Sequence, residues 1–225
     1  MEFEINKGKG YIKEYDYYGE LRFEGEYLNG ERNGKGKEYD CDYGGDGDFN
    51  KGRKLIFEGE YKNGKRNGKG IEYNDNGKIE FEGEYLNGKQ WNGKIYEYSI
   101  VGDNLAFEGE YLNGKRNGKG KEYDKDGQLE FEGNYLDGKR NGTGKEYKDD
   151  KVIFEGDYLN DKRWNGKGKE YNYVKNEEIF EGEYLNGERW NGYGREYDSE
   201  GNIIFRGEYK KGKHRYYDEL FFEDF

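Results

Sequence analysis

Apolar and polar residues alternate over short stretches of this chain, which is the pattern of β-strands. Residues 107–112 read Phe-Glu-Gly-Glu-Tyr-Leu, so the aromatic residues and the glycine share one face and the glutamates occupy the other. Asn113 and Gly114 follow as a turn, because both residue types tolerate positive φ. A second alternating stretch at 119–123 predicts the returning strand, so the segment is expected to form a β-hairpin.

The same segment recurs along the whole chain. Its copies start 23 to 26 residues apart, except for a first interval of 34 residues. A fixed period of this length is typical of repeat architectures. We therefore predict an all-β fold, an elongated single-layer antiparallel β-meander of stacked hairpin repeats. The copies begin at Phe23, Phe57, Phe81, Phe107, Phe131, Phe154, Phe180 and Phe205.

One repeat array is expected to occupy residues 1–225. Residues 1–22 form a partial repeat and cap, 23–204 hold seven repeats, and 205–225 hold a last partial repeat and cap. The aromatic and leucine residues of the final segment share one helical face, which predicts a short C-terminal capping helix. The alternative is a peptide that docks into a partner. The residues of that face are Tyr217, Leu220, Phe221 and Phe225.

Two registers are open for each hairpin. One puts Glu108 on the face of Lys121, with Phe107 lying over glycine. The other sets Phe107 beside Tyr123 but places Glu108 next to Glu122, a like-charge contact that costs roughly 0.2–1 kcal/mol. Charge favours the first register. The face of Tyr123 stays open, because a bulge near Glu122 would re-aim it.

Composition supports a thin, distributed apolar layer. Charged residues make up 40% of the chain and hydrophobic residues only 31%, which argues against an ordinary globular core. The 18% aromatic content and the strict period argue against disorder. No proline occurs, so every backbone N–H can join a ladder of hydrogen bonds.

The recurring pattern Phe/Tyr-Glu-Gly-Glu-Tyr-x-Asn-Gly-Lys-Arg-Asn-Gly-Lys-Gly resembles the MORN repeat (membrane occupation and recognition nexus). The likeness runs from about Lys9 to Gly212. This chain departs in often having 24 or more residues per repeat and in its Lys-Glu-Tyr segment. The resemblance implies an extended antiparallel sheet and an adaptor or scaffold role, with protein contact better supported than lipid binding.

Enzymatic chemistry has little basis in the sequence. The single Cys41 and the single His214 are far apart in a linear array. Residues 109–115 fit a phosphate-binding loop up to the lysine, but Arg116 replaces the required Ser or Thr. The acidic insertion 40–50 is out of step with a calcium loop. We expect no catalytic residue, no cofactor and no metal, and a solvated loop at the insertion.

The candidate partner-binding residues are aromatic. Three copies carry an extra tryptophan in the turn region, and tryptophan is enriched at binding hot spots. The alternative is that each ring folds onto its neighbour and fills a packing gap. The candidates are Trp91, Trp164, Trp190, Phe107, Tyr111, Phe131, Tyr135, Phe154 and Tyr158.

Charge separates along the predicted sheet, with lysines near the Asn-Gly turns and aspartates in the opposite loops. The net charge of −11 and the pI near 4.9 disfavour nucleic acid and weaken membrane binding. The predicted function is a non-enzymatic scaffold that binds another protein, a helix or a second copy, through an open aromatic-glycine face or the tryptophan-bearing edge. The alternative is peripheral phospholipid binding through the basic edge.

The cellular location is predicted from two features of the sequence, the lack of an apolar leader and the single cysteine. No stretch of the sequence reaches membrane-spanning length, and one cysteine forms no internal disulfide. The cytoplasm is predicted, with a peripheral position at a membrane or the cytoskeleton as a variant.

Overall fold

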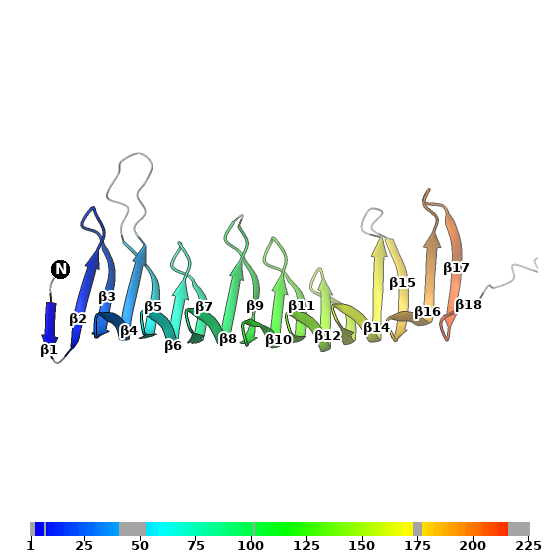
Figure 1. Ribbon diagram of the computed structural model, residues 1–225. Helices are drawn as coiled ribbons and strands as arrows, with labels where there is room; N and C mark the ends of the chain where they lie inside the picture. Colours follow the sequence, from blue (N-terminus) through cyan, green and yellow to red (C-terminus); the bar gives the residue numbers. More distant parts are fainter. Residues whose placement is uncertain (1–2, 7, 41–52, 101, 173–176, 216–225) are drawn as a thin grey trace, which may run out of the picture. The chain divides into compact units, whose positions relative to one another are not determined.

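The computed structural model describes residues 3–6, 8–40, 53–100, 102–172 and 177–215 (Figure 1). Every regular element among these residues is a β-strand, and no helix occurs in them. Cys41, residues 41–50 of the acidic insertion and the predicted C-terminal helix lie outside the described residues. The expectations of a solvated loop rather than a calcium site at the insertion, and of a C-terminal capping helix, therefore remain predictions.

The chain divides into two compact units, Met1–Gly118 and Lys119–Phe225. In the first unit each strand from β1 to β9 pairs antiparallel with the next. The strands are β1 (Phe3–Asn6), β2 (Lys9–Tyr15), β3 (Leu21–Leu28), β4 (Glu31–Asp40), β5 (Lys54–Lys62), β6 (Lys65–Tyr73), β7 (Ile79–Leu86), β8 (Lys89–Tyr98) and β9 (Leu105–Leu112).

The boundary between the units falls inside β10 (Lys115–Tyr123). In the second unit each strand from β11 to β18 again pairs antiparallel with the next, so the prediction of a hairpin meander is confirmed. The strands are β11 (Leu129–Leu136), β12 (Lys139–Lys148), β13 (Lys151–Leu159), β14 (Lys162–Asn172), β15 (Glu177–Leu185), β16 (Glu188–Tyr197), β17 (Ile203–Lys210) and β18 (Lys213–Arg215).

The register places opposite charges across the strands. In the β11–β12 hairpin Glu132 lies opposite Lys145, and Gly133 lies opposite Gly144. The β3–β4 hairpin has the same arrangement, with Glu24 opposite Lys37. In these hairpins the charge-matched register predicted from the sequence is therefore confirmed.

The tyrosine of the Lys-Glu-Tyr segment lies on the face opposite the phenylalanines. A bulge separates Glu146 from Tyr147 where β12 pairs with β13. The Tyr147 hydroxyl donates a hydrogen bond to Glu132 Oε1 at 2.6 Å, on the side of the sheet away from Phe131. The same contact joins Tyr39 to Glu24 at 2.8 Å. These contacts settle the face that the sequence left open, in the copies where they occur.

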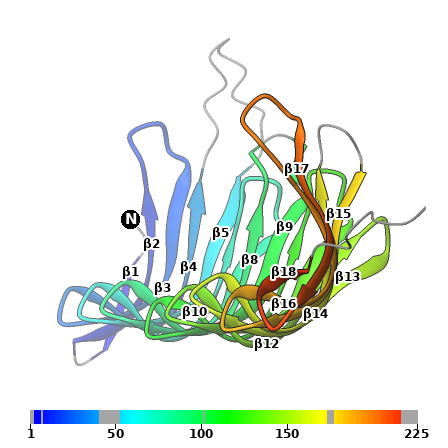
Figure 2. The same ribbon diagram turned by 90° about the vertical axis from the view of Figure 1, so that its right-hand side faces the viewer.

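A second bulge bends each hairpin. In β11–β12 the pair Gly133–Gly144 is followed by the pair Tyr135–Arg140, so three residues of β12 face one residue of β11. Bulges of this kind bend a strand and increase its twist. Figure 2 shows the strands of each unit bending part-way along their length. The turn half of a hairpin runs from the tyrosine of the Phe-Glu-Gly-Glu-Tyr segment, through the turn, to the arginine that follows it. The rest of the hairpin is called the loop half.

The bend buries the phenylalanine rings inside the angle between the two halves. Phe131 lies against the paired glycines and meets Tyr135 edge-on, with ring centroids 5.7 Å apart. Tyr158 of the next hairpin meets the same ring at 5.0 Å. The rings that are less than 2% exposed are Phe23, Phe57, Phe81, Phe107, Phe131, Phe154 and Phe180.

This burial corrects the expectation of an open aromatic face. The sequence predicted an open single-layer sheet, which would leave Phe131 and Phe154 in solvent. Both rings are 0% exposed, because the turn half folds its tyrosine and arginine over them. The rings do lie over glycine, as predicted.

The fit of ring to glycine gives the first testable prediction. A Cβ on Gly144 would lie 2.7 Å from Cε2 and Cζ of Phe131, closer than real side chains approach. Gly144→Ala should therefore displace the ring and lower stability by about 1–3 kcal/mol, the usual cost of overpacking. Thermal melting of the full chain measures the change. Lys139→Ala, at an exposed turn position, is the control; equal melting midpoints for both variants would contradict the packing described.

Candidate functional site

An arginine covers the buried phenylalanine of almost every copy. The residue follows the Asn-Gly turn at a fixed offset, and its guanidinium carbon lies 4.1 Å from the ring centroid in Arg140–Phe131. A cation over an aromatic face is attracted by the ring quadrupole. The other pairs are Arg32–Phe23, Arg66–Phe57, Arg116–Phe107, Arg163–Phe154 and Arg189–Phe180, at 3.8 to 4.9 Å.

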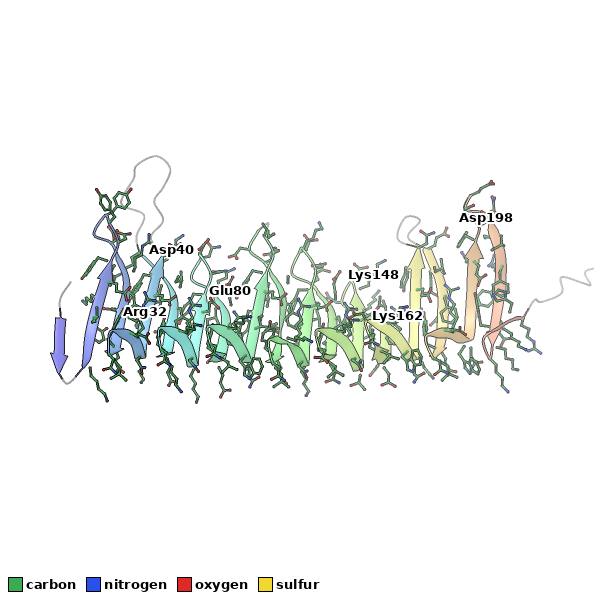
Figure 3. The ribbon with its side chains drawn as sticks, viewed as in Figure 1. Arg32, Asp40, Glu80, Lys148, Lys162 and Asp198 are labelled. Carbon is green, nitrogen blue, oxygen red and sulfur yellow. The ribbon has the colours of Figure 1, made fainter. Side chains whose placement is uncertain are left out.

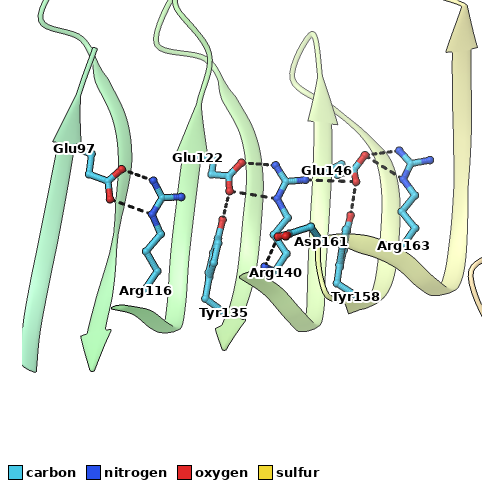
Figure 4. Close-up of polar contacts among 9 residues, drawn as sticks. All are labelled: Glu97, Arg116, Glu122, Tyr135, Arg140, Glu146, Tyr158, Asp161 and Arg163. Atoms are coloured by element: carbon cyan, nitrogen blue, oxygen red, sulfur yellow. Dashed lines mark hydrogen bonds and ion pairs between the residues drawn. The ribbon is translucent and has the colours of Figure 1, made fainter. Parts of the chain in front are cut away.

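Each of these arginines also binds a glutamate of the preceding hairpin. Arg140 donates from Nε and Nη2 to the two carboxylate oxygens of Glu122, and Arg163 donates to Glu146 (Figure 4). The Tyr158 hydroxyl donates to Glu146 Oε1 at 2.8 Å. We call the alternating row of these side chains the arginine–glutamate ladder. Two-point contacts of this kind fix the orientation of both groups.

Burial and hydrogen bonding shift the pKa values of two ladder groups, Glu170 and Tyr209. Burial acts to raise the pKa of Glu170, but hydrogen bonds from Arg189 and Tyr184 outweigh burial and hold that pKa below its ordinary value. Burial and the nearby Glu196 raise the pKa of Tyr209 to about 12. At neutral pH Glu170 is therefore an ionised acceptor and Tyr209 a neutral donor.

Two copies depart from the arginine rule. In the last copy His214 takes the place of arginine, stacks on Phe205 with centroids 3.9 Å apart, and lies 3.0 Å from Glu196. In the copy that begins at Phe81 the residue is Gln90, whose amide donates to Glu72 at 2.7 Å. The sequence contained this signal, since arginine recurs at one offset, but a repeated cation was interpreted as a solvated edge.

The inserted tryptophans shift the hairpin register. In β13–β14, Tyr158 lies opposite Arg163 and Asp157 lies opposite Asn165, so Trp164 is one extra residue. Phe154 consequently lies opposite Gly168, whereas Phe131 of the preceding hairpin lies opposite a glutamate. The hairpins with Trp91 and Trp190 show the same shift.

Two tryptophan rings fold onto the next turn. A Cβ on Gly187 would lie 3.4 Å from the Trp164 ring, and one on Gly212 would lie 3.5 Å from the Trp190 ring. The backbone N–H groups of these glycines donate to the Trp164 and Trp190 carbonyls at 2.9 Å. This packing is the alternative that the sequence left open. Both side chains are half-buried, so part of each ring remains accessible.

Trp91 differs in its packing and in its position. The N–H of Gly114 donates to the Trp91 carbonyl, but the atom nearest to a Cβ on Gly114 would be the Gln90 carbonyl oxygen at 3.7 Å. Trp91 belongs to the first unit, whereas Trp164 and Trp190 lie at adjacent turns of the second. The structure thus brings two of the three predicted tryptophans together in one unit.

The remaining predicted residues are mostly enclosed. Phe107, Phe131, Phe154, Tyr135 and Tyr158 are buried, and Tyr111 is half-buried. A partner reaching this face would meet the arginines and glutamates first.

Exposed leucines mark the turn halves, and the sequence analysis did not single them out. Leu136 is 51% exposed and lies opposite Lys139; Leu159 is 39% exposed and lies opposite Lys162. Leu86 and Leu112 are the exposed leucines of the first unit. The signal was the leucine that directly precedes the turn in most copies.

Charged side chains lie at both ends of the hairpins. Lys162 lies toward the turns, whereas Asp198 lies at a loop in the same unit (Figure 3). Asp198 closes its loop by accepting from the N–H groups of Glu200 and Asn202 at 2.9 and 2.8 Å. No group of three metal-ligating side chains occurs in the part of the chain that the structure describes. In that same part no helix is long and apolar enough to cross a membrane.

These features define a repeat protein built from glycine- and aromatic-rich β-hairpins. The chain contains four MORN repeats, and the family model matches residues 23–45, 57–79, 107–129 and 131–151. The resemblance seen in the sequence is confirmed. The copies beginning at Phe81, Phe154 and Phe180, which the model does not match, are those with an inserted tryptophan and a shifted register. A comparison with curated proteins gives no match.

The lowered pKa of Glu170 predicts acid sensitivity. A carboxyl group with a lower pKa in the folded state stabilises the fold fully above its unfolded pKa of 4.5 and loses that contribution as pH falls through the folded value. The melting temperature should therefore drop as pH is lowered below about 4.5, and Glu170→Gln should flatten this slope while lowering stability at pH 7. Glu200→Gln, at an exposed loop position, is the matched control. Identical slopes for the two variants would refute the assignment.

Proposed function

We propose that this chain is a non-enzymatic scaffold that binds another protein at the turn edge of its second unit. The turn edge is the surface formed by Leu136, Lys139, Leu159, Lys162 and the accessible parts of Trp164 and Trp190. The single observation that carries the proposal is the position of two half-buried tryptophans at adjacent turns of a unit with exposed leucines. Tryptophan and apolar anchors dominate the energetics of many protein interfaces.

The chemistry of this edge indicates the kind of partner. Leu136 and Leu159 offer apolar contacts, and Lys139 and Lys162 lie opposite them and are exposed. A partner segment with apolar side chains and acidic flanks would match both. The ladder face is a poorer docking surface, because its aromatic rings are already covered.

Family membership agrees with this role without specifying it. MORN repeats are generally found in scaffold and membrane-associated proteins. A cytoplasmic location, with attachment at a membrane or the cytoskeleton through the partner, is part of the proposal.

A second candidate is peripheral binding to an anionic membrane. The alternation of exposed leucine and lysine at the turns favours it, since apolar side chains enter the interface while lysines meet headgroups. The net charge of −11 opposes it, because the long-range field repels an anionic surface. Protein binding is therefore the leading proposal.

The third prediction separates the two candidates. In affinity capture from the native cell extract, Leu136→Glu with Leu159→Glu should reduce recovery of a specific partner about tenfold or more, because charge enters an apolar contact. Ile203→Glu with Ile204→Glu, the same change at exposed residues near the start of β17, is the control and should leave recovery unchanged. Both pairs are exposed, so folding should survive, as thermal melting will show.

Two outcomes would contradict protein binding at this edge. Equal recovery of every partner by both double variants would place the contact elsewhere. Salt-sensitive flotation of the purified chain with phosphatidylserine vesicles, lost in the variant with Leu136→Glu and Leu159→Glu only, would favour the membrane alternative.

A further inference from the structure

The arginine–glutamate ladder is interrupted at one place in the described residues. Gln90 lies opposite Tyr85, just as Arg66 lies opposite Tyr61. In the other copies a guanidinium, or the His214 ring, covers the phenylalanine. No cation lies over Phe81 among the described residues. Gln90 reproduces the hydrogen bond to Glu72 but supplies neither the charge nor the length of arginine.

A cavity lies where this side chain is short. Its volume is about 380 Å³, and Arg66, Glu72, Tyr85, Gln90 and Tyr111 are among the residues that line it. Cavities of roughly 300–1,000 Å³ are typical of small-ligand sites.

Tyr111 provides an acceptor that the rest of the ladder does not use. The equivalent tyrosines donate to ladder glutamates, as Tyr85 does to Glu72 at 3.0 Å. The Tyr111 hydroxyl forms no hydrogen bond within the described part of the chain. Its ring centroid lies 5.9 Å from that of Phe81, farther than the 5.0 Å between Phe57 and Tyr85.

Two other copies show what this cavity is shaped to hold. The hairpins with Trp164 and Trp190 have the same shifted register as the Trp91 hairpin, and both retain the arginine. Arg189 Nη1 lies 3.0 Å from the Tyr209 hydroxyl, and Arg163 Nη1 donates to the Lys169 carbonyl at 2.9 Å. The corresponding acceptor that lines the cavity beside Gln90 is the Tyr111 hydroxyl.

The described ladder of the first unit has one arginine fewer than it has glutamates. The described ladder of the first unit contains four glutamates, Glu14, Glu38, Glu72 and Glu97, but three arginines, Arg32, Arg66 and Arg116. Lys89 lines the cavity too. It lies opposite Leu86, one position from Gln90, so its side chain is directed to the other face of the sheet. Arg66 is already bound by Glu38 and Glu72.

We propose that the cavity beside Gln90 binds a guanidinium group, and that its occupant is an arginine side chain of the partner protein. The guanidinium N–H groups donate to the Tyr111 hydroxyl, next to the carboxylate of Glu72, which also lines the cavity. An ammonium group carries the same charge but lacks the planar donor fork, so arginine is preferred over lysine. The identity of the occupant rests on the proposed function; the binding of guanidinium does not.

The direct test uses a small probe. N-acetyl-arginine amide is titrated into the full chain while tyrosine and phenylalanine ring signals are followed by NMR, with N-acetyl-lysine amide as the matched cation. The expected result is saturable shifts of Tyr111 with arginine, and binding at least about tenfold weaker with lysine. Equal binding of the two probes, or no saturable binding, would overturn the proposal.

Two variants locate the site. Gln90→Arg fills the cavity from within, so it should abolish probe binding and raise the melting temperature by restoring the ladder. Gln90→Ala keeps the cavity open and should retain binding, which controls for any change at this position. Unchanged probe affinity in Gln90→Arg would show that the probe binds elsewhere and would refute the site.

Partner capture separates this inference from the proposed function. If Gln90→Arg loses probe binding and reduces partner recovery, the arginine assignment is supported. If it loses probe binding but keeps full recovery, the partner does not use this site and the assignment of the occupant is wrong, while the scaffold proposal stands. If the probe binds but no partner is recovered by the unaltered chain, the guanidinium site stands and the scaffold proposal fails.

Discussion

The burial of each phenylalanine ring against side-chain-free backbone is the constraint on which the rest of the structure depends. A single-layer sheet has no second layer to cover its apolar face. Here the bulge beside Gly133 and Gly144 bends the hairpin, and the turn half brings a tyrosine and an arginine over Phe131. The two glycines leave the space in which the ring lies. A chain with 31% hydrophobic residues can thereby build a buried core one ring at a time.

The ladder follows from that arrangement. An arginine drawn over a buried ring is partly desolvated, so it needs a paired and hydrogen-bonded carboxylate. Glu146 meets this need for Arg163 and also accepts from Tyr158, so each contact joins neighbouring hairpins. No buried side-chain nitrogen or oxygen atom lacks a partner among the described residues. Because the links run between nearest neighbours, stability is carried along the array, and the ladder ties the register of each hairpin to the next.

The fold was predictable from the sequence as far as pairwise rules reach. Period-two alternation predicted the strands, and the Asn-Gly dipeptides predicted the turns. Matching of opposite charges predicted the register, in which Glu132 lies opposite Lys145. The bend was not predictable, since it arises from three residues of one strand facing one residue of the other, a mismatch that no hydrophobic pattern encodes. Without the bend, Phe131 was expected to lie on an open face of the sheet. The side of Tyr147 likewise depended on a bulge.

Identical copies in a repeat array offer a partner no unique binding position. A copy that departs from the pattern does offer one. Each tryptophan insertion changes the hairpin register by adding one residue that has no cross-strand partner. Gln90 removes a cation from a ladder that places an arginine over six of the other rings. The copy that begins at Phe81 carries both changes. Its neighbours hold the ring, the carboxylate and the tyrosine in place, so the altered copy keeps a preorganised site while lacking the side chain that fills it elsewhere. This copy lacks the stabilising contact that an arginine makes in most other copies. An incoming guanidinium would meet groups that are already positioned.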